Sequence, residues 1–148
     1  MKNLIYVFAA IVLISCGGGT NKKASATAQT KGAAQGDRIE VLYFHGAQRC
    51  ITCRAIEKHT IELLDSLYSK ELANGAIVFK AIDISQKENE AIADKYEVTW
   101  SSLFINGWKN NQETINNMTD YAFSYVKGQP DVFKTGIKDK IEELRPKQ

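Results

Sequence analysis

The sequence has few of the residues that would place it in a specialised class of protein. Its two prolines, Pro130 and Pro146, both lie near the C-terminus, which excludes a proline-rich linker protein. Its formal net charge of +2 is too small to indicate a nucleic-acid-binding surface. Three cysteines are too few for a disulfide-stapled miniprotein, and their odd number leaves at least one to explain separately. With 44% hydrophobic and 24% charged residues, the composition is that of an ordinary globular domain.

The N-terminal segment is apolar but short. Lys2 gives a positive start, residues 4–14 form an unbroken apolar run, and a small residue precedes Cys16, as in a secretory signal peptide. A membrane-spanning helix needs about 20 apolar residues, so we expect residues 1–15 to be cleaved rather than kept as an uncleaved signal anchor. The run Leu13-Ile14-Ser15-Cys16 resembles the bacterial lipobox. This resemblance implies that Cys16 is lipidated, and that the protein is an exported bacterial lipoprotein, anchored in the cell envelope and facing the periplasm.

The rest of the chain divides into a linker and a domain. Residues 17–36 contain five Gly, five Ala and no large aliphatic or aromatic side chain, so we expect a flexible linker. Residues 37–148 have the length of a common single domain, whose core needs no metal or disulfide to hold it together.

Hydrophobic patterns predict alternating strands and helices in this domain. Strands are expected at residues 38–44, 76–83 and 98–105, with a weak fourth strand from Trp108, and helices at residues 51–72, 85–96, 120–127 and 130–144. The pair Asn106-Gly107 is a strong hairpin signal, and Ser85 to Glu88 form a predicted capping box. We expect an α/β fold with a central, mostly parallel sheet of about four strands flanked by helices, and a C-terminal helical tail.

The chemistry of the chain is concentrated in Cys50-Ile51-Thr52-Cys53, which follows the first predicted strand and opens the first predicted helix. Two cysteines three residues apart on a helical turn are close enough to form a disulfide. The free backbone N–H groups and the helix dipole stabilise a thiolate at Cys50, and neighbouring Arg49 adds to this, so the pKa of this thiol should fall below its ordinary value of about 8.5. Cys53 lies one turn further and should stay protonated until it resolves a mixed disulfide.

The order of strand, C-x-x-C and helix resembles the thioredoxin-like superfamily. The longer run from Tyr43 to Glu57, which contains F-H-G-x-x-R-C-x-T-C-R-x-I-E, resembles a narrower group, the nitrophenyl compound nitroreductase subunit ArsF family. The similarity continues through Ser101-Ser102-Leu103 and the stretch from Phe133 to Gly136. Because the chain has no G-x-G-x-x-G motif, the resemblance implies an electron-delivering or thiol partner rather than a nitro-reducing centre with its own cofactor.

Two departures from thioredoxin bear on the predicted site. Arg49 stands where thioredoxins have a tryptophan, and Ile51-Thr52 replaces their Gly-Pro, which should alter substrate choice and redox potential. The thioredoxin fold also places a cis-proline opposite the two cysteines, where this chain has Ser101 or Ser102 as the substrate-facing loop. Without that proline, the two thiolates capture a metal or metalloid ion more easily.

Other polar and aromatic residues have more than one interpretation. His45 either tunes the thiolate, acts as a third metal ligand beside the cysteines, or makes a local hydrogen bond at the end of a strand. Glu57 lies one turn after Cys53 and either accepts the proton of the resolving thiol or is a solvated helix carboxylate. We expect Trp100 and Trp108 to be packing and hairpin residues.

These residues favour a membrane-tethered thiol–disulfide oxidoreductase, in which Cys50 is the nucleophile and Cys53 the resolving thiol. It would need no diffusible cofactor and would exchange disulfides with a protein partner or an upstream reductase. Two alternatives stay open. The first is a soft metal or metalloid-binding module that uses Cys50, Cys53 and His45, and the second is a non-catalytic adaptor subunit of a reductase whose disulfide is structural.

Overall fold

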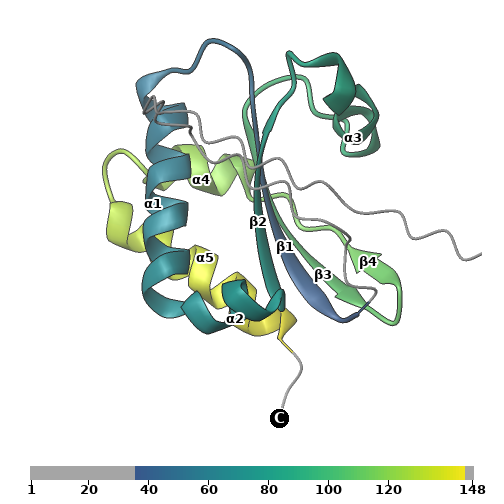
Figure 1. Cartoon of the computed structure of the whole chain (residues 1–148). Helices are drawn as coiled ribbons and strands as arrows, with labels where there is room; N and C mark the ends of the chain where they lie inside the picture. The colour runs from purple at the N-terminus through teal and green to yellow at the C-terminus, as the bar shows by residue number, and fades with distance from the viewer. Residues whose placement is uncertain (1–35, 146–148) are drawn as a thin grey trace, which may run out of the picture. The chain divides into compact units, whose positions relative to one another are not determined.

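The computed structural model describes residues 36–145, which belong to one compact unit (Figure 1). The expected signal peptide, the lipidated Cys16 and nearly all of the expected linker lie outside the described residues. Within the described part of the chain, no helix is both long and apolar enough to cross a membrane.

Four strands and five α-helices make up the described domain. In chain order they are β1 (Arg38–His45), α1 (Ile51–Leu67), α2 (Ser69–Asn74), β2 (Ile77–Asp83), α3 (Glu90–Lys95) preceded by the 3-10 turn Lys87–Asn89, β3 (Ser102–Lys109), β4 (Gln112–Thr114), α4 (Thr119–Tyr125) and α5 (Pro130–Leu144). The first and last of these elements begin and end within a residue of their predicted bounds.

The strands form one sheet in the order β2-β1-β3-β4. β1 runs parallel to β2, whereas β3 is antiparallel to β1 and β4 is antiparallel to β3. The chain thus forms a β-α-β unit followed by a β-hairpin and a C-terminal helix, so the predicted α/β class, the four strands and the C-terminal helix are confirmed. The sheet is mixed rather than mostly parallel, because β3 enters beside β1 from the opposite end.

The two faces of the sheet are covered unequally. Side chains alternate across β1, so that Val41 and Tyr43 pack toward α1 and α5, and Leu42 and Phe44 pack toward α3. Figure 1 shows α1, α2, α4 and α5 on one side of the sheet and only α3 on the other. The larger core therefore lies beneath α1. Packing against this core sets where along the sheet that helix begins.

The hairpin turn lies four residues later than predicted. Asn106 and Gly107 are paired residues within β3, and the loop between β3 and β4 is Asn110-Asn111. Both of these asparagines have positive φ angles, 52° and 61°, as a two-residue type I′ turn requires. Gly107 has another role, because a Cβ there would lie 3.2 Å from Leu144 Cδ2 of α5.

Two helix predictions were also wrong in detail. The predicted helix over 51–72 is divided at Tyr68, whose backbone leaves helical angles while its buried ring places its hydroxyl 2.7 Å from Glu142 of α5. The predicted capping box at Ser85 does not form. Ser85 instead donates through its N–H and its hydroxyl to Asp83, so the chain makes a turn there and the α-helix starts only at Glu90.

Candidate active site

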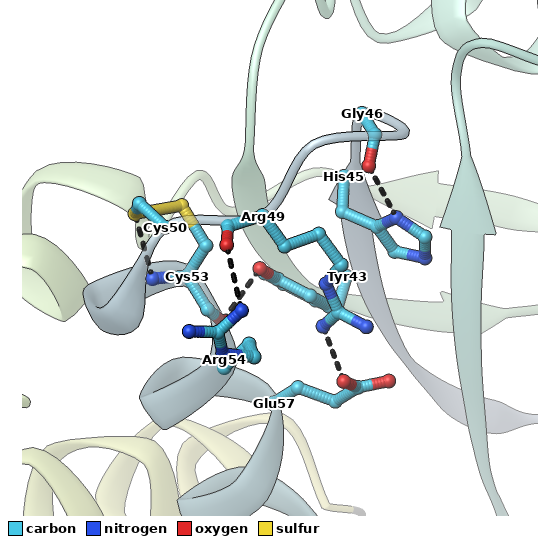
Figure 2. Close-up of a disulfide and its surroundings, with 8 residues drawn as sticks. All are labelled: Tyr43, His45, Gly46, Arg49, Cys50, Cys53, Arg54 and Glu57. Carbon is cyan, nitrogen blue, oxygen red and sulfur yellow. Dashed lines mark hydrogen bonds and ion pairs between the residues drawn. A yellow bond between two sulfur atoms is a disulfide. The ribbon is translucent and has the colours of Figure 1, made fainter.

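The two cysteines of the C-x-x-C motif form a disulfide at the first turn of α1 (Figure 2). Cys50 is the N-cap of the helix, with extended backbone angles, and its sulfur accepts a hydrogen bond from the N–H of Cys53 at 3.0 Å. Cys50 is exposed, whereas Cys53 is buried with 7% of its surface accessible. The first cysteine is thus accessible and the second is shielded.

The motif is tied to the sheet by a buried tyrosine. Tyr43 of β1 donates its hydroxyl hydrogen bond to the backbone carbonyl of Cys53 at 2.7 Å. Burial raises the pKa of the Tyr43 phenol, against the lowering effect of hydrogen bonds from Arg49 and Ser101. The phenol therefore stays protonated and serves as a donor at neutral pH. The sequence patterns gave Tyr43 no role, because its contact with Cys53 depends on how β1 and α1 pack.

Arg49 lies over Tyr43 and pairs with Glu57. Its guanidinium carbon is 5.5 Å from the centre of the Tyr43 ring, and its Nη2 forms an ion pair with a Glu57 oxygen. In Figure 2 this guanidinium extends away from the two sulfurs and toward Glu57. Glu57 thus compensates part of the positive charge that was expected to act on the Cys50 thiolate. Glu57 is not a freely solvated carboxylate, since 22% of its side chain is accessible.

Arg49 and its neighbour Arg54 keep the loop before α1 in place. Burial lowers the pKa of Arg49, but the hydrogen bonds that its guanidinium donates to Glu57 and Tyr43 raise it more, so the group is a permanent cation. Arg54 donates from Nη1 to the carbonyl of Arg49 at 3.0 Å. The Nε of Arg49 is buried without a hydrogen-bond partner among the described residues. The loop before Cys50 is therefore held by two contacts of Arg49: its side chain pairs with Glu57, and its carbonyl accepts from Arg54.

His45 does not join the cysteines. Its Nδ1 lies 3.0 Å from the carbonyl oxygen of Gly46, and its ring lies 5.8 Å from the Tyr43 ring, on the side away from the sulfurs (Figure 2). Over residues 36–145, no three His, Cys, Asp or Glu side chains are grouped so that they could hold a metal ion. The local hydrogen bond, one of the three interpretations of His45, is what the structure shows.

The two serines in the position of the thioredoxin proline lie beside this network. Ser101 and Ser102 are both buried, and the Ser101 side chain hydrogen-bonds to the Tyr43 hydroxyl. Ser102 starts β3 and donates its hydroxyl hydrogen bond to the carbonyl of Trp100 at 3.0 Å. Ser101 thus reaches Cys53 through one intervening side chain, that of Tyr43.

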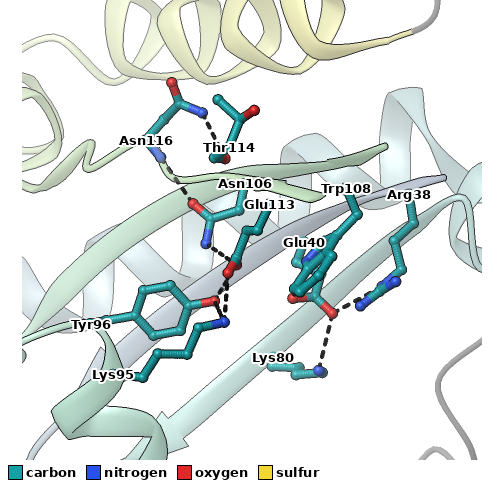
Figure 3. A network of polar contacts seen from close by, with 10 residues as sticks. All are labelled: Arg38, Glu40, Lys80, Lys95, Tyr96, Asn106, Trp108, Glu113, Thr114 and Asn116. Atoms are coloured by element: carbon teal, nitrogen blue, oxygen red, sulfur yellow. Dashed lines mark hydrogen bonds and ion pairs between the residues drawn. The ribbon is translucent and has the colours of Figure 1, made fainter. Parts of the chain in front are cut away.

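A second polar cluster occupies the other face of the sheet, away from the disulfide (Figure 3). Glu40 of β1 is 6% exposed and accepts hydrogen bonds from Arg38, Lys80 and Trp108. Burial raises the pKa of this carboxyl, but those cationic and donor groups together bring it below its usual value. Glu40 is therefore a buried, ionised acid on the first strand. Because it lies two residues before Leu42 on β1, it shares the sheet face of Leu42 and points away from Cys53.

The same cluster holds the short edge strand in place. Glu113 of β4 accepts hydrogen bonds from Tyr96 and Lys95 beside α3 and from Asn106 of β3. The other end of the Asn106 amide accepts from the N–H of Asn116 at 3.0 Å. Every charged group in these contacts has a partner, as a buried polar network requires. We assign this cluster to the stability of the hairpin, which includes Trp108 as predicted.

No family model matches the chain, and no curated protein matches it. Among solved structures, a Fasciola hepatica thioredoxin is similar over 73% of this chain and 82% of its own, with 22% identity and a TM-score of 0.45. A Chlamydomonas reinhardtii thioredoxin f2 is similar over 66% of this chain and 85% of its own, with 16% identity and a TM-score of 0.43. A malarial protein covers 74% of this chain and 99% of its own, with 16% identity and a TM-score of 0.47. The narrower ArsF-type resemblance stays a prediction.

Proposed function

We propose that the protein is a thiol–disulfide oxidoreductase that uses the Cys50–Cys53 pair. The observation that carries the proposal is the unequal exposure of the two disulfide-bonded cysteines at the start of α1, with Cys50 open to solvent and Cys53 buried. An exchange reaction needs one sulfur that a partner can reach and a second that reacts only after the mixed disulfide has formed. A purely structural disulfide, as in the adaptor alternative, has no need of an exposed sulfur at a helix N-terminus.

The reaction balances without a further oxidant or cofactor. In the reduced protein, the Cys50 thiolate attacks a partner disulfide, which forms a mixed disulfide and releases one partner thiolate. The Cys53 thiol then gives its proton to the partner thiolate released in the first step and attacks the Cys50 sulfur. This second step closes the Cys50–Cys53 disulfide and releases the second partner thiolate. The partner gains two electrons and the protein loses two, and the same steps in reverse oxidise a dithiol partner.

The residues around the motif support these steps. The helix N-terminus favours negative charge at Cys50, and the N–H of Cys53 already donates to the Cys50 sulfur. Tyr43 holds the carbonyl of Cys53, and Arg49 with Glu57 fixes the loop before Cys50. Ser101 and Ser102 form the loop beside the site that we propose meets the partner chain. Glu57 acts on the motif through Arg49, whose positive charge it compensates.

We further propose that the protein acts in the cell envelope. The lipobox-like run ending at Cys16 supports a lipid anchor, and residues 17–36 would link that anchor to the catalytic domain facing the periplasm. An exported protein meets an oxidising compartment. After each reaction there, a thiol or disulfide protein partner or an upstream reductase must return the Cys50–Cys53 pair to the redox form in which it began.

Trapping of the mixed disulfide tests the proposed reaction. In a reduced Cys53→Ser variant, attack by Cys50 on a disulfide substrate cannot be resolved, so a covalent adduct should accumulate and disappear on addition of dithiothreitol. The matched Cys50→Ser variant keeps only the buried sulfur and should form little adduct. Absence of an adduct in Cys53→Ser, with the fold intact by circular dichroism, would contradict the proposal.

A further inference from the structure

An exposed aromatic pair lies beside the candidate active site. Trp100 is 54% exposed, and its ring packs on that of Phe123 in α4, with the ring centres 5.1 Å apart and the planes inclined by 42°. The prediction that Trp100 is simply a packing residue therefore holds for one face of the indole only. A tryptophan that leaves its other face in water forgoes much of the stabilisation that its burial would give.

The pair is connected to the cysteines by a short chain of contacts. Trp100 directly precedes Ser101, which hydrogen-bonds to Tyr43, and Tyr43 in turn donates to the carbonyl of Cys53. Phe123 is connected to the motif by a different element, since α4, which carries it, packs against both β3 and α1. The aromatic pair and the disulfide therefore belong to one end of the sheet, where α1 begins and β3 enters.

The backbone beneath the pair is fixed by hydrogen bonds. Ser102 donates to the carbonyl of Trp100, and the N–H of Leu103 donates to the hydroxyl of Thr119 at 3.0 Å. The N–H of Met118 donates to the carbonyl of Leu103 at 2.8 Å. These bonds join the start of α4 to the start of β3, so the two aromatic rings are held in position before any partner arrives.

The exposed surface next to Cys50 has the same apolar character. Ile51 follows Cys50 and is 73% exposed, although it occupies the first position of α1. The Arg49 guanidinium, one residue before Cys50, is engaged by Glu57. A partner that approaches Cys50 thus meets exposed isoleucine and tryptophan side chains, together with the guanidinium of Arg54, which donates to the carbonyl of Arg49.

We infer that Trp100 and Phe123 form a docking surface for a polypeptide that carries a large apolar or aromatic side chain beside its reactive cysteine. This inference rests on the proposed disulfide exchange and adds to it the class of substrate. Exposed tryptophans that are held rigidly are the side chains that most often dominate the binding energy of protein interfaces. Small disulfides such as oxidised glutathione would reach Cys50 without touching this surface.

The experiment compares three substrates of the reduced full-length protein: a mixed disulfide of a peptide with phenylalanine next to its cysteine, the same peptide with serine in that place, and oxidised glutathione. Trp100→Ala should slow reduction of the phenylalanine peptide roughly tenfold, which corresponds to the loss of one strong interface residue. The rates with the serine peptide and with oxidised glutathione should stay within about twofold. Leu67→Ala is the matched control, because Leu67 is 53% exposed at the far end of α1.

Two further results decide the inference. Trp100→Phe should restore most of the rate with the phenylalanine peptide, since it returns an aromatic face beside Phe123. Equal reduction rates of the two peptides by the unchanged protein, or an equal loss with glutathione in Trp100→Ala, would overturn the docking surface while leaving disulfide exchange intact. Failure of the unchanged protein to reduce any of the three substrates would overturn the proposed function itself, and the docking surface with it.

Discussion

Tyr43 and Cys53 are joined by a hydrogen bond from the phenol of the central strand to the backbone carbonyl of the buried cysteine, 2.7 Å long. The tyrosine is fully buried, so the bond is shielded from competing water. Because it uses the backbone of Cys53 and not its sulfur, the bond is available in both the disulfide and the dithiol form. Strand β1 thereby holds the reactive turn in place throughout the reaction cycle.

The Tyr43→Phe variant tests the strength of this connection. It removes the hydroxyl alone and leaves Ser101 and the Cys53 carbonyl without their partner, so the free energy of unfolding should fall by about 1–3 kcal/mol. Urea denaturation of the oxidised and the reduced protein should show similar losses. Tyr125→Phe is the control, because the Tyr125 hydroxyl has no hydrogen bond in the described part of the chain while its ring packs on Tyr121. A loss confined to the oxidised form would contradict a redox-independent contact.

Glu57→Gln tests whether the ion pair between Glu57 and Arg49 keeps the pKa of the Cys50 thiol from falling further. Removing the carboxylate leaves the Arg49 cation uncompensated near the helix N-terminus, which favours the thiolate, so the pKa of the Cys50 thiol should fall. The titration is followed by thiolate absorbance in the reduced Cys53→Ser background. Glu62→Gln makes the same charge change further along α1 and should have little effect. A rise in the pKa on Glu57→Gln would show that Glu57 acts on Cys50 by another route.

Glu62 makes a pH-dependent contribution to stability. Hydrogen bonds from Lys134 and His59 lower the pKa of its carboxyl from its ordinary value of 4.5 to about 2. Since the folded pKa lies below the unfolded one, the stabilisation is complete above about pH 4.5 and is lost as the pH falls toward 2. Lys134→Ala should raise the pKa of Glu62, as read by NMR titration of its carboxyl. Lys58→Ala, whose ammonium lies 3.7 Å away, should raise it less.

The local part of the site could be predicted from the sequence, and the non-local part could not. The C-x-x-C spacing specifies a helical turn by itself, so Cys50 as cap and Cys53 as the shielded sulfur follow from neighbouring residues. Tyr43 reaches that turn from β1, and Ser101 reaches Tyr43 from the loop before β3. Their contact depends on how the sheet and α1 pack, and alternating hydrophobicity shows that Tyr43 is buried without showing what its hydroxyl meets.

The position of the hairpin turn likewise could not be predicted from local sequence alone. Asn106-Gly107 and Asn110-Asn111 are both acceptable as turns on local grounds. Pairing with β1 keeps Gly107 opposite Ile39, and the Asn106 side chain is used for hydrogen bonds to Glu113 and Asn116. These distant partners extend β3 beyond the local signal and move the turn to Asn110-Asn111.

The last prediction concerns Gly136, which belongs to the stretch that carries the family resemblance. Gly136 lies within α5, and a Cβ at this position would overlap the ring and hydroxyl of Tyr121 from α4. Tyr121 in turn donates to the carbonyl of Val132 at 2.6 Å. The absence of a side chain at residue 136 therefore lets α4 pack against α5, and α4 carries Phe123.

A double-mutant cycle separates this packing from helix propensity. Alanine in place of an interior helical glycine is favoured by up to about 1 kcal/mol when nothing obstructs it. Gly136→Ala should nonetheless lower the free energy of unfolding by about 1–2 kcal/mol, since Tyr121 must move and lose its bond to Val132. In a Tyr121→Ala background the same change should become stabilising. Gly128→Ala, with no atom within 4 Å of the added Cβ, should be nearly neutral. A destabilising Gly136→Ala in both backgrounds would mean that Tyr121 is not what requires the glycine.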